Sequence, residues 1–516
     1  MRVVSDYTGS DRTLTQICNW IQDCVHNHQH CDRTQVSTLL PKRLVEILGP
    51  EKVVLRTTNT DTTGSYVALS HCWGNTRFIQ TTKSSLLQYQ QKICWNDLPK
   101  TFKEAVDITR RLGMRYLWID SLCIVQDDID DWREEGSNMA SIYSGSYLTI
   151  AASKSSDSSG GCYAKNATAD VSQTYEFLNT NGQKYTIALQ KLPDHPDIYG
   201  HPDFPIFDRA WVLQERWLSP RTIHFGPLEV LWECNESKTC ECTDWTDTED
   251  DFSKEYMMGN KASKPSWNGI PSLGTGWRDL VKVYSKLQLT DERDIFPAIQ
   301  GIAKHFHEKM QCAYYAGLWE SSLIEDLLWF GSYYQDSQSR SKSWRAPTWS
   351  WASTSKVSWK FYADTTALAT VVATSTIPVG SDTFGEICGG ELQLKGRCID
   401  AMLMETIRSK LGFDKRRHIV LKVKNGEKEE VLKDSFSADF TPSLRGNTTA
   451  KIMEMAVSTK TTLYYRECFY LVFQCVDEEQ QVYERIGIVC QLIYETWFDL
   501  PWHFEHYGEE LVLRVV

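Results

Sequence analysis

The sequence lacks the features that mark nucleic-acid-binding and membrane-spanning proteins. Its 516 residues carry 55 Lys and Arg against 67 Asp and Glu, a formal net charge of −12. Binding to phosphate backbones needs a surplus of Lys and Arg on at least one face, so this balance argues against a general nucleic-acid binder. No run approaches the roughly 20 apolar residues of a membrane span, and the first residues lack the basic start and apolar core of a secretory signal. We therefore expect a cytoplasmic protein without a membrane span.

Apolar and aromatic residues, by contrast, are plentiful. Hydrophobic residues make up 41% of the chain, which contains 19 tryptophans, so there is ample apolar area for a packed core. A chain of this length is too long for one ordinary core, and two or three domains are expected. The 16 cysteines are spread thinly through the chain. In a reducing compartment most of them should be buried free thiols rather than disulfides.

Helical and strand patterns alternate over the first part of the chain. A helical pattern runs from about residue 12 to 31, and a second helix begins near Pro99 and ends at Gly113. Short apolar runs typical of buried strands occur at residues 67–69, 116–119 and 148–152, the last two separated by a further helical pattern. This alternation predicts an α/β fold with a parallel sheet and helices on both faces.

The later part of the chain is organised differently. Asn181-Gly182 lies between two short strand patterns and indicates a hairpin, an insertion near residues 162–205. Alternating apolar residues beyond Trp344 favour an antiparallel sheet. The expected organisation is a helical segment at 1–60, an α/β domain at 61–240, an acidic linker or surface excursion at 241–275, a helical connection at 276–340 and a β-rich region at 341–516.

Three separated strings carry a family resemblance. They are ALSHCWG at residues 68–74, LWIDSLCI at 117–124 and RAWVLQER at 209–216. Together they resemble the fungal heterokaryon incompatibility (HET) domain over roughly residues 66–216. The resemblance implies a role in fungal non-self recognition, in which contact between unlike partners triggers programmed cell death. It also implies control by self-association or by another protein. A small-molecule biosynthetic enzyme, or a non-catalytic scaffold on the same fold, remains an alternative.

The order of the predicted elements is also similar to that of Toll/interleukin-1 receptor (TIR) domains, and some TIR domains cleave NAD. In TIR domains a tryptophan precedes an acid by four positions, and Trp211 and Glu215 reproduce that spacing. The resemblance implies an NAD glycohydrolase in which the Glu215 carboxylate stabilises an oxocarbenium-like ribose. Asp120, at a strand end, would orient ribose hydroxyls, and Trp211 would stack on an aromatic ring. NAD is then a substrate, and no cofactor is expected.

The three strings supply the remaining candidate site residues. Glu215 and Asp120 are the catalytic candidates, and the ligand-binding candidates are Ser70, His71, Trp73, Cys123, Arg209 and Trp211. For Glu215 the alternative is an ion pair with Arg209 or Arg216, and for Asp120 it is capping of the following turn. Cys123 could also approach His71 as a nucleophile beside a base, although nothing identifies a third, orienting residue.

One group of metal-binding residue types lies near the start of the chain. Cys24, His28 and Cys31 have helix-compatible spacing, and a fourth ligand could come from Cys234, Cys240 or Cys242. The paired Cys-x-x-Cys spacing typical of zinc sites is missing. The sequence therefore favours buried thiols with a hydrogen-bonded histidine, and it predicts no metal site.

Overall fold

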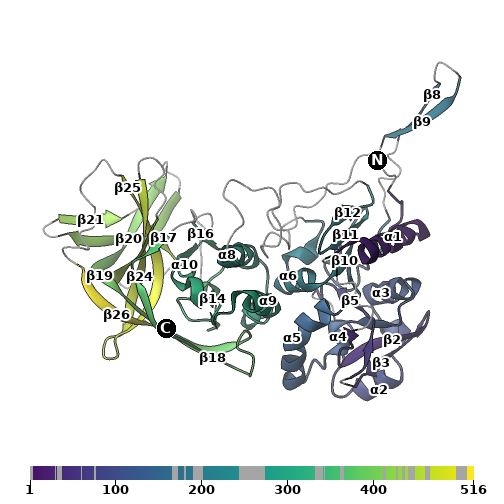
Figure 1. Ribbon diagram of the computed structural model, residues 1–516, viewed down its shortest axis with the longest axis horizontal. Coiled ribbons are helices and arrows are strands. Elements are labelled where there is room, and N and C mark those ends of the chain that lie inside the picture. The colour runs from purple at the N-terminus through teal and green to yellow at the C-terminus, as the bar shows by residue number, and fades with distance from the viewer. Residues whose placement is uncertain are drawn as a thin grey trace. The chain divides into compact units, whose positions relative to one another are not determined.

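The structure, a computed structural model, divides into two compact units, Met1–Tyr256 and Met257–Val516 (Figure 1). The described residues are 4–29, 31, 38–59, 61–74, 77–165, 173–178, 182–189, 202–242, 273–331, 341, 343–360, 365–410, 414–425, 428–432, 436–439, 448–458, 465–494 and 508–516.

An eight-stranded sheet forms the centre of the first unit, in the order β12-β11-β10-β7-β5-β6-β2-β3. The strands β6, β5, β7 and β10 are parallel to their neighbours within this group, whereas the pairs at both ends of the sheet are antiparallel. The bounds are β2 (Arg43–Gly49), β3 (Lys52–Thr57), β5 (Val67–Ser70), β6 (Tyr116–Trp118), β7 (Leu148–Ala151), β10 (Arg221–Phe225), β11 (Val230–Cys234) and β12 (Lys238–Cys240).

The α/β character predicted from the sequence is confirmed, but the expectation of a parallel sheet holds only for its centre. Strands joined by connections of a few residues can pair only in antiparallel fashion, because a parallel pair needs a long crossover. Such short connections join β2 to β3, β10 to β11 and β11 to β12. The sheet is therefore mixed.

Helices cover both faces of this sheet. Figure 1 shows α5 and α6 on one face and α1 and α3 on the other. Right-handed crossovers require this arrangement, because β6 and β7 lie on opposite sides of β5 and the chain reverses its direction across the sheet after β6. The bounds are α1 (Asp11–Asn27), α2 (Leu86–Gln91), α3 (Lys100–Arg111), α4 (Asp120–Cys123), α5 (Ile129–Ser144) and α6 (Ala210–Leu218).

The strand β5 lies at the reversal point of the sheet, and all of its residues are buried. The next strand along the chain pairs on one side of β5 and the one after it on the other. In open α/β sheets the crevice outside the carboxyl ends of the strands at such a switch point is where ligands bind. Ser70, the last residue of β5, lies at this end.

The first unit departs from the expected organisation near its start. Residues 1–60, predicted to be helical, contain α1, but residues 43–57 form the hairpin β2–β3 at the edge of the sheet. The apolar run of β2 packs into the core of the sheet, which a helical assignment ignored. Within the predicted hairpin insertion, β8 (Gln173–Leu178) and β9 (Lys184–Leu189) pair in antiparallel fashion. The short strands β1 (Thr38–Leu39) and β4 (Thr63–Gly64) pair with each other.

Most of the predicted linker, residues 243–272, lies outside the described residues.

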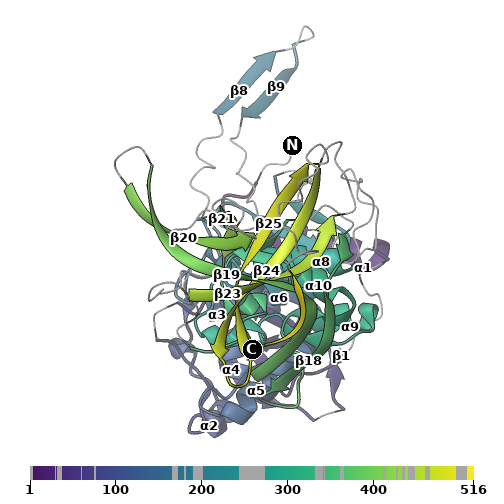
Figure 2. The ribbon, with the colours of Figure 1, turned by 90° about the vertical axis from the view of Figure 1, so that its left-hand side faces the viewer.

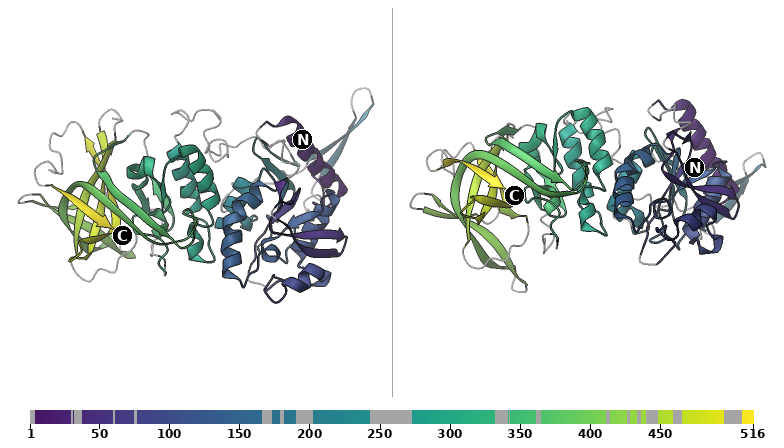
Figure 3. Two further views of the ribbon diagram at one scale, coloured as in Figure 1. Left: turned by 60° about the horizontal axis from the view of Figure 1, so that its bottom comes forward. Right: turned by 90° about the horizontal axis from the view of Figure 1, so that it is seen from below.

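The second unit begins with helices packed around aromatic side chains. The helices are α8 (Leu273–Tyr284), α9 (Gln300–Met310) and α10 (Leu323–Asp326), and Figure 3 shows α8 and α9 side by side in teal. The ring of Trp277 lies 5.3 Å from that of Phe306 and 5.5 Å from that of Trp319, between ring centroids. Short strands pair locally: β13 (Tyr314–Tyr315) with β14 (Leu318–Trp319), and β15 (Trp329–Gly331) with β16 (Val357–Trp359).

A ten-stranded sheet completes the second unit, which confirms the β-rich C-terminal region. Its longest strand, β19, has 24 residues and pairs in turn with β18, β26, β23 and β20, and Figure 2 shows it curving through the sheet. The buried Arg485 pairs with Asp439 and donates to the carbonyl oxygens of Leu327 and Trp329, which links this sheet to the start of β15. The strands are β17 (Thr365–Ala367), β18 (Thr370–Pro378), β19 (Ile387–Lys410), β20 (Asp414–Asn425), β21 (Lys428–Leu432), β22 (Phe436–Ala438), β23 (Thr448–Ser458), β24 (Tyr465–Asp477), β25 (Val482–Tyr494) and β26 (Glu509–Val515).

None of the described helices combines the length and the apolar character that a membrane span requires.

Candidate functional site

Side chains from three distant segments meet beyond the carboxyl ends of the parallel strands. Ser70 ends β5, Asp120 begins the short helix α4 directly after β6, and Glu215 lies in the middle of α6. The Ser70 hydroxyl donates a hydrogen bond to Oε2 of Glu215 at 2.5 Å. Both side chains are buried. The structure thus brings together residues from all three sequence strings at the switch point of the sheet.

Glu215 is a buried carboxyl group in a mixed electrostatic environment. Its burial raises its pKa to about 7, and the nearby Asp120 carboxylate adds to that rise. The positive charge of Arg209 and the hydrogen bond from Ser70 act in the opposite direction. The Tyr143 hydroxyl also approaches Glu215, and it donates to the carbonyl oxygen of Leu69 at 3.2 Å. A carboxyl with a pKa near 7 can hold or release a proton at physiological pH, as general acid–base catalysis requires.

Asp120 is the more accessible of the two carboxylates, with 20% of its side chain exposed. Its Oδ2 accepts a hydrogen bond from the indole Nε1 of Trp73 at 2.7 Å, and its Oδ1 accepts one from the backbone N–H of Ser121 at 2.6 Å. The second contact joins neighbouring residues and is not an N-cap, because the N-cap of α4 is Ile119, which makes no side-chain cap hydrogen bond. The first contact joins Asp120 to Trp73, which belongs to another of the three sequence strings.

His71 is buried between the acid and an aromatic wall. Its Nδ1 lies 3.8 Å from Oδ1 of Asp120, and its ring meets those of Phe102 and Phe78 edge-on, at centroid distances of 5.0 and 6.2 Å. Burial lowers the pKa of His71 to about 4, so the imidazole is neutral at physiological pH. Neither ring nitrogen has a hydrogen-bond partner among the described residues. A buried imidazole without hydrogen bonds costs free energy of folding, and a polar group of a bound ligand would supply the missing hydrogen bond.

Arg209 and Trp211 lie at the start of α6. Arg209 precedes the first residue of the helix, and its Nη1 donates to the backbone carbonyl oxygen of His71. The ion pair of Glu215 with Arg209 or Arg216, weighed from the sequence, is not formed within the described residues. Arg216 instead makes a buried two-point pair with Glu233, with nitrogen–oxygen distances of 2.5 and 3.1 Å. Trp211 lies one turn before Glu215 and is only partly buried.

Cys123 does not take part in a nucleophile–base arrangement. Its sulfur accepts a hydrogen bond from the backbone N–H of Ile119 at 3.5 Å, and no hydrogen bond joins it to His71, although both residues are described. Burial raises the pKa of Cys123 to about 12, which keeps it a neutral thiol, and only the thiolate is a good nucleophile. The inclusion of Cys123 among ligand-binding residues has no support from these contacts, because the side chain turns back into the protein.

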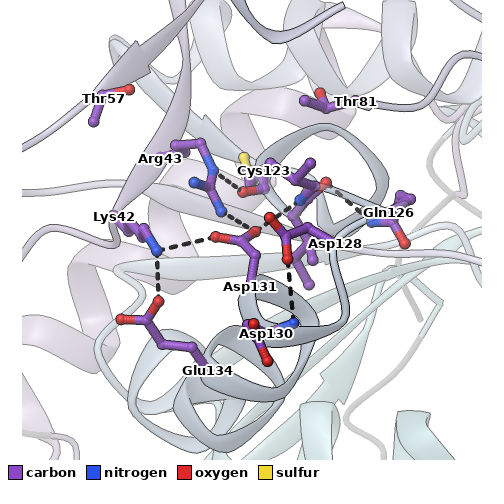
Figure 4. Close-up of polar contacts among 12 residues, drawn as sticks. Lys42, Arg43, Thr57, Thr81, Cys123, Gln126, Asp128, Asp130, Asp131 and Glu134 are labelled. Carbon is purple, nitrogen blue, oxygen red and sulfur yellow. Dashed lines mark hydrogen bonds and ion pairs between the residues drawn. The ribbon is translucent and has the colours of Figure 1, made fainter. Parts of the chain in front are cut away.

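Ion pairs and hydrogen bonds of Arg43, Lys42 and Asp131 hold the segment that follows Asp120 (Figure 4). Arg43, at the start of β2, donates from Nε to the carbonyl oxygen of Cys123 at 2.6 Å and pairs through Nη2 with Asp131. Asp131 also accepts from the backbone N–H of Val125 at 2.9 Å and from Lys42 at 3.0 Å. The acidic run at residues 127–131 therefore anchors a loop and caps α5.

Sequence reasoning missed the residues that support the site. The aromatic wall of Phe78 and Phe102, the Tyr143 hydroxyl and the loop anchor Arg43 were either assigned to the core or not considered. An arginine at the head of a largely apolar strand is a signal that could have pointed to Arg43, because a buried charge needs a partner. No spacing rule points to the other three.

Two clusters of metal-binding residue types also form in the first unit. Cys24, His28, Cys31 and Cys234 place their ligand atoms within 4.8 Å of one another. Cys240 and Cys242, the other proposed partners of the first three, form a separate group with Glu229.

Comparison with known families gives one match. Residues 66–215 match the family model for heterokaryon incompatibility protein (HET). The matched segment begins one residue before β5 and ends at Glu215, so it contains every residue of the site from Ser70 to Glu215. No curated protein and no solved structure matches the chain.

Proposed function

Because residues 66–215 form a HET domain, we propose that the chain is a fungal recognition protein that triggers programmed cell death. The observation that carries this proposal is that Ser70, Asp120 and Glu215 converge inside the matched segment. Burial of a carboxyl group costs free energy, and carboxyl groups with strongly shifted pKa values gather at functional sites, which supports this assignment. We take these three residues to form the effector site, controlled by self-association or by a partner protein.

A second candidate function, cleavage of NAD, is supported by the different surroundings of the two carboxyl groups. Glu215 is buried with a pKa near 7, whereas Asp120 is partly exposed and held by Trp73. In many enzymes that cleave glycosidic bonds, two carboxyl groups in different environments have different roles, one as general acid or base and the other as nucleophile or stabiliser of positive charge. The parallel strands also have the order β6-β5-β7-β10, in which the first strand along the chain is second in the sheet, as in flavodoxin-like folds. This order supports the proposed similarity to TIR domains.

The proposed reaction breaks the bond between nicotinamide and ribose. The bonding electron pair leaves with the nicotinamide nitrogen, which neutralises its positive charge, and an oxocarbenium-like ribose remains. The ionised Glu215 stabilises that charge, and Asp120 orients the ribose hydroxyls. Water then adds to the ribose carbon and gives up a proton, which Glu215 can accept. The neutral His71 offers a further hydrogen-bonding group beside Asp120.

Expression in a fungal host tests the effector proposal. We expect inducible expression of the wild-type chain to arrest or kill the host, and Glu215→Gln to remove this effect at equal protein level. Glu51→Gln is the matched control, because Glu51 is an exposed acid at the turn between β2 and β3. A healthy strain that overexpresses the wild-type chain would contradict the proposal.

Incubation of the purified chain with NAD tests the second candidate. Free nicotinamide should appear with the wild-type chain and with Glu51→Gln, and should fall by about 100-fold or more with Glu215→Gln, because a removed catalytic group typically costs that much. If NAD stays unchanged at high protein concentration while expression kills the host, the effector proposal stands and NAD is not the substrate. Nicotinamide release without killing would favour a metabolic role.

A further inference from the structure

Four metal-binding side chains from three parts of the first unit meet at one point. Cys24 lies in the last turn of α1, His28 caps the end of that helix, and Cys31 follows three residues later. Cys234 is the last residue of β11, 206 positions after His28 in the sequence. The three cysteines are buried, with exposures of 0, 0 and 5%, and 16% of the histidine side chain is exposed.

The distances among these atoms fit one small tetrahedral ion. Nδ1 of His28 lies 3.3 Å from the sulfur of Cys234 and 3.8 Å from the sulfur of Cys31, and all four ligand atoms lie within 4.8 Å of one another. Zinc binds thiolate sulfur at about 2.3 Å and imidazole nitrogen at about 2.0–2.1 Å. Ligands at those lengths in a tetrahedron are separated by roughly 3.5–3.8 Å. We propose that Cys24, His28, Cys31 and Cys234 bind one zinc ion.

The groups around the four residues support this assignment independently. Metal-ligating histidines usually direct their second ring nitrogen towards a carboxylate, and Nε2 of His28 lies 3.8 Å from Oδ2 of Asp23. The backbone N–H of Ser237 donates to the sulfur of Cys234 at 3.3 Å, and the Ser237 hydroxyl lies at the same distance. Such donors stabilise a negatively charged thiolate.

The zinc ion has a structural role in this proposal. Four protein ligands close the coordination shell and leave no position for water or substrate, as in structural zinc sites. The ion links the end of α1 to the end of β11, where Trp20 already packs on Trp232 at a centroid distance of 6.4 Å. It would therefore hold the N-terminal helix on the sheet. This role is independent of the chemistry proposed at Glu215.

Metal analysis of the purified full-length chain is the first test. We expect one zinc ion per chain in protein prepared without chelators, as measured by inductively coupled plasma mass spectrometry. After removal of zinc, added Co²⁺ should give the strong visible absorption of tetrahedral cobalt with thiolate ligands. Zinc should also protect three cysteines from alkylation, which peptide mapping identifies as Cys24, Cys31 and Cys234. A chain without zinc, without the cobalt bands, or with a disulfide among these cysteines overturns the proposal.

Substitutions provide the second test. Cys234→Ser should lose the zinc, whereas Cys162→Ser should keep it, because Cys162 is an equally buried free thiol outside the cluster. If Cys234→Ser does not fold, two substitutions of His28 test the proposal instead. His28→Ala should lose zinc, and His28→Cys should retain it, since four thiolates also form a structural zinc site. Equal zinc content in His28→Ala and His28→Cys would contradict the assignment of His28 as a ligand.

Discussion

Ser70 donates its hydroxyl hydrogen to Oε2 of Glu215 across 145 positions of the sequence. This bond joins the carboxyl end of the central strand β5 to the middle of α6, and it is buried on both sides. It therefore makes the ionisation of Glu215 depend on a residue from another sequence string.

Ser70→Ala should raise the pKa of Glu215 further above its usual range, because the hydrogen bond from Ser70 favours the charged carboxylate. Nicotinamide release by this variant should shift to higher pH than in the wild-type chain. The free energy of unfolding should fall by about 1–3 kcal/mol, the range for a lost bond to a charged group. Ser70→Thr, which keeps a hydroxyl, is the control. An identical pH profile in Ser70→Ala would contradict the coupling.

The proposed NAD cleavage should depend on pH through Glu215. The carboxylate form is the active one, and its pKa is about 7, so the rate should rise as the pH increases through that value. His71, whose pKa is about 4, is already neutral over this range and should not contribute to the change. A rate profile of nicotinamide release between about pH 5 and 9 checks this. A rate that falls as the pH rises through 7 would assign Glu215 a different role.

The sequence predicted more of the fold than of the site. Strands near Val67, Tyr116 and Leu148 were identified because buried strands form short apolar runs, and the Trp211 to Glu215 spacing placed both residues on α6. What the sequence could not supply was lateral pairing. The apolar residues of β2 do not by themselves distinguish a strand from a helix. The strand assignment depends on pairing with β3 and β6, which the local sequence does not show.

The same limit applies to the site. The sequence could indicate that Asp120 and Glu215 were candidates, because each stands in a distinctive string. It could not show that Arg216 would pair with Glu233 and leave Glu215 to Ser70, because that choice depends on which helix face meets β11. Likewise, the choice of Cys234 over Cys240 and Cys242 depends on where β11 ends.

A second buried acid, Glu135 on α5, should make stability depend on pH. Burial raises its pKa to about 7, and neither carboxyl oxygen has a hydrogen-bond partner among the described residues. Because the pKa of Glu135 is higher in the folded state than in the unfolded chain, its protonated form favours folding. The free energy of unfolding is therefore highest below the unfolded pKa of 4.5 and falls as the pH rises from there through about 7. Glu135→Gln should therefore stabilise the chain at pH above 7 by roughly 3 kcal/mol, and little below pH 4.5.

Urea denaturation followed by tryptophan fluorescence measures this difference. Glu134→Gln is the control, because Glu134 is its exposed neighbour on the same helix and should change stability by less than about 1 kcal/mol. If Glu135→Gln were no more stable than the wild-type chain at high pH, the side chain would have a partner that keeps it ionised.

Asp23 should strengthen zinc binding by orienting His28. Its carboxylate lies 3.8 Å from Nε2 of His28 and is itself exposed, so Asp23→Asn should leave the fold intact. Loss of such a supporting carboxylate typically weakens metal affinity by about 10-fold to 100-fold. Competition of the purified chain against a chromogenic zinc chelator measures this change, and Asp11→Asn on the same helix is the control. Unchanged zinc affinity would show that Asp23 does not orient His28.

Arg43 and Lys42 offer a matched test of the network that holds the Asp120 turn. Both pair with Asp131, but the Arg43 side chain is 6% exposed and that of Lys42 is 39% exposed. Arg43→Met leaves the Asp131 carboxylate buried with one partner fewer and frees the Cys123 carbonyl oxygen, so we expect a loss of about 3–5 kcal/mol of unfolding free energy. Lys42→Met removes two solvent-screened pairs, with Asp131 and with Glu134, and should cost about 1 kcal/mol or less. Arg43→Met should also reduce nicotinamide release at temperatures where it stays folded, because the Asp120 turn loses its anchor. Equal costs for the two variants would show that the turn is held by Thr81 and Gln126 instead.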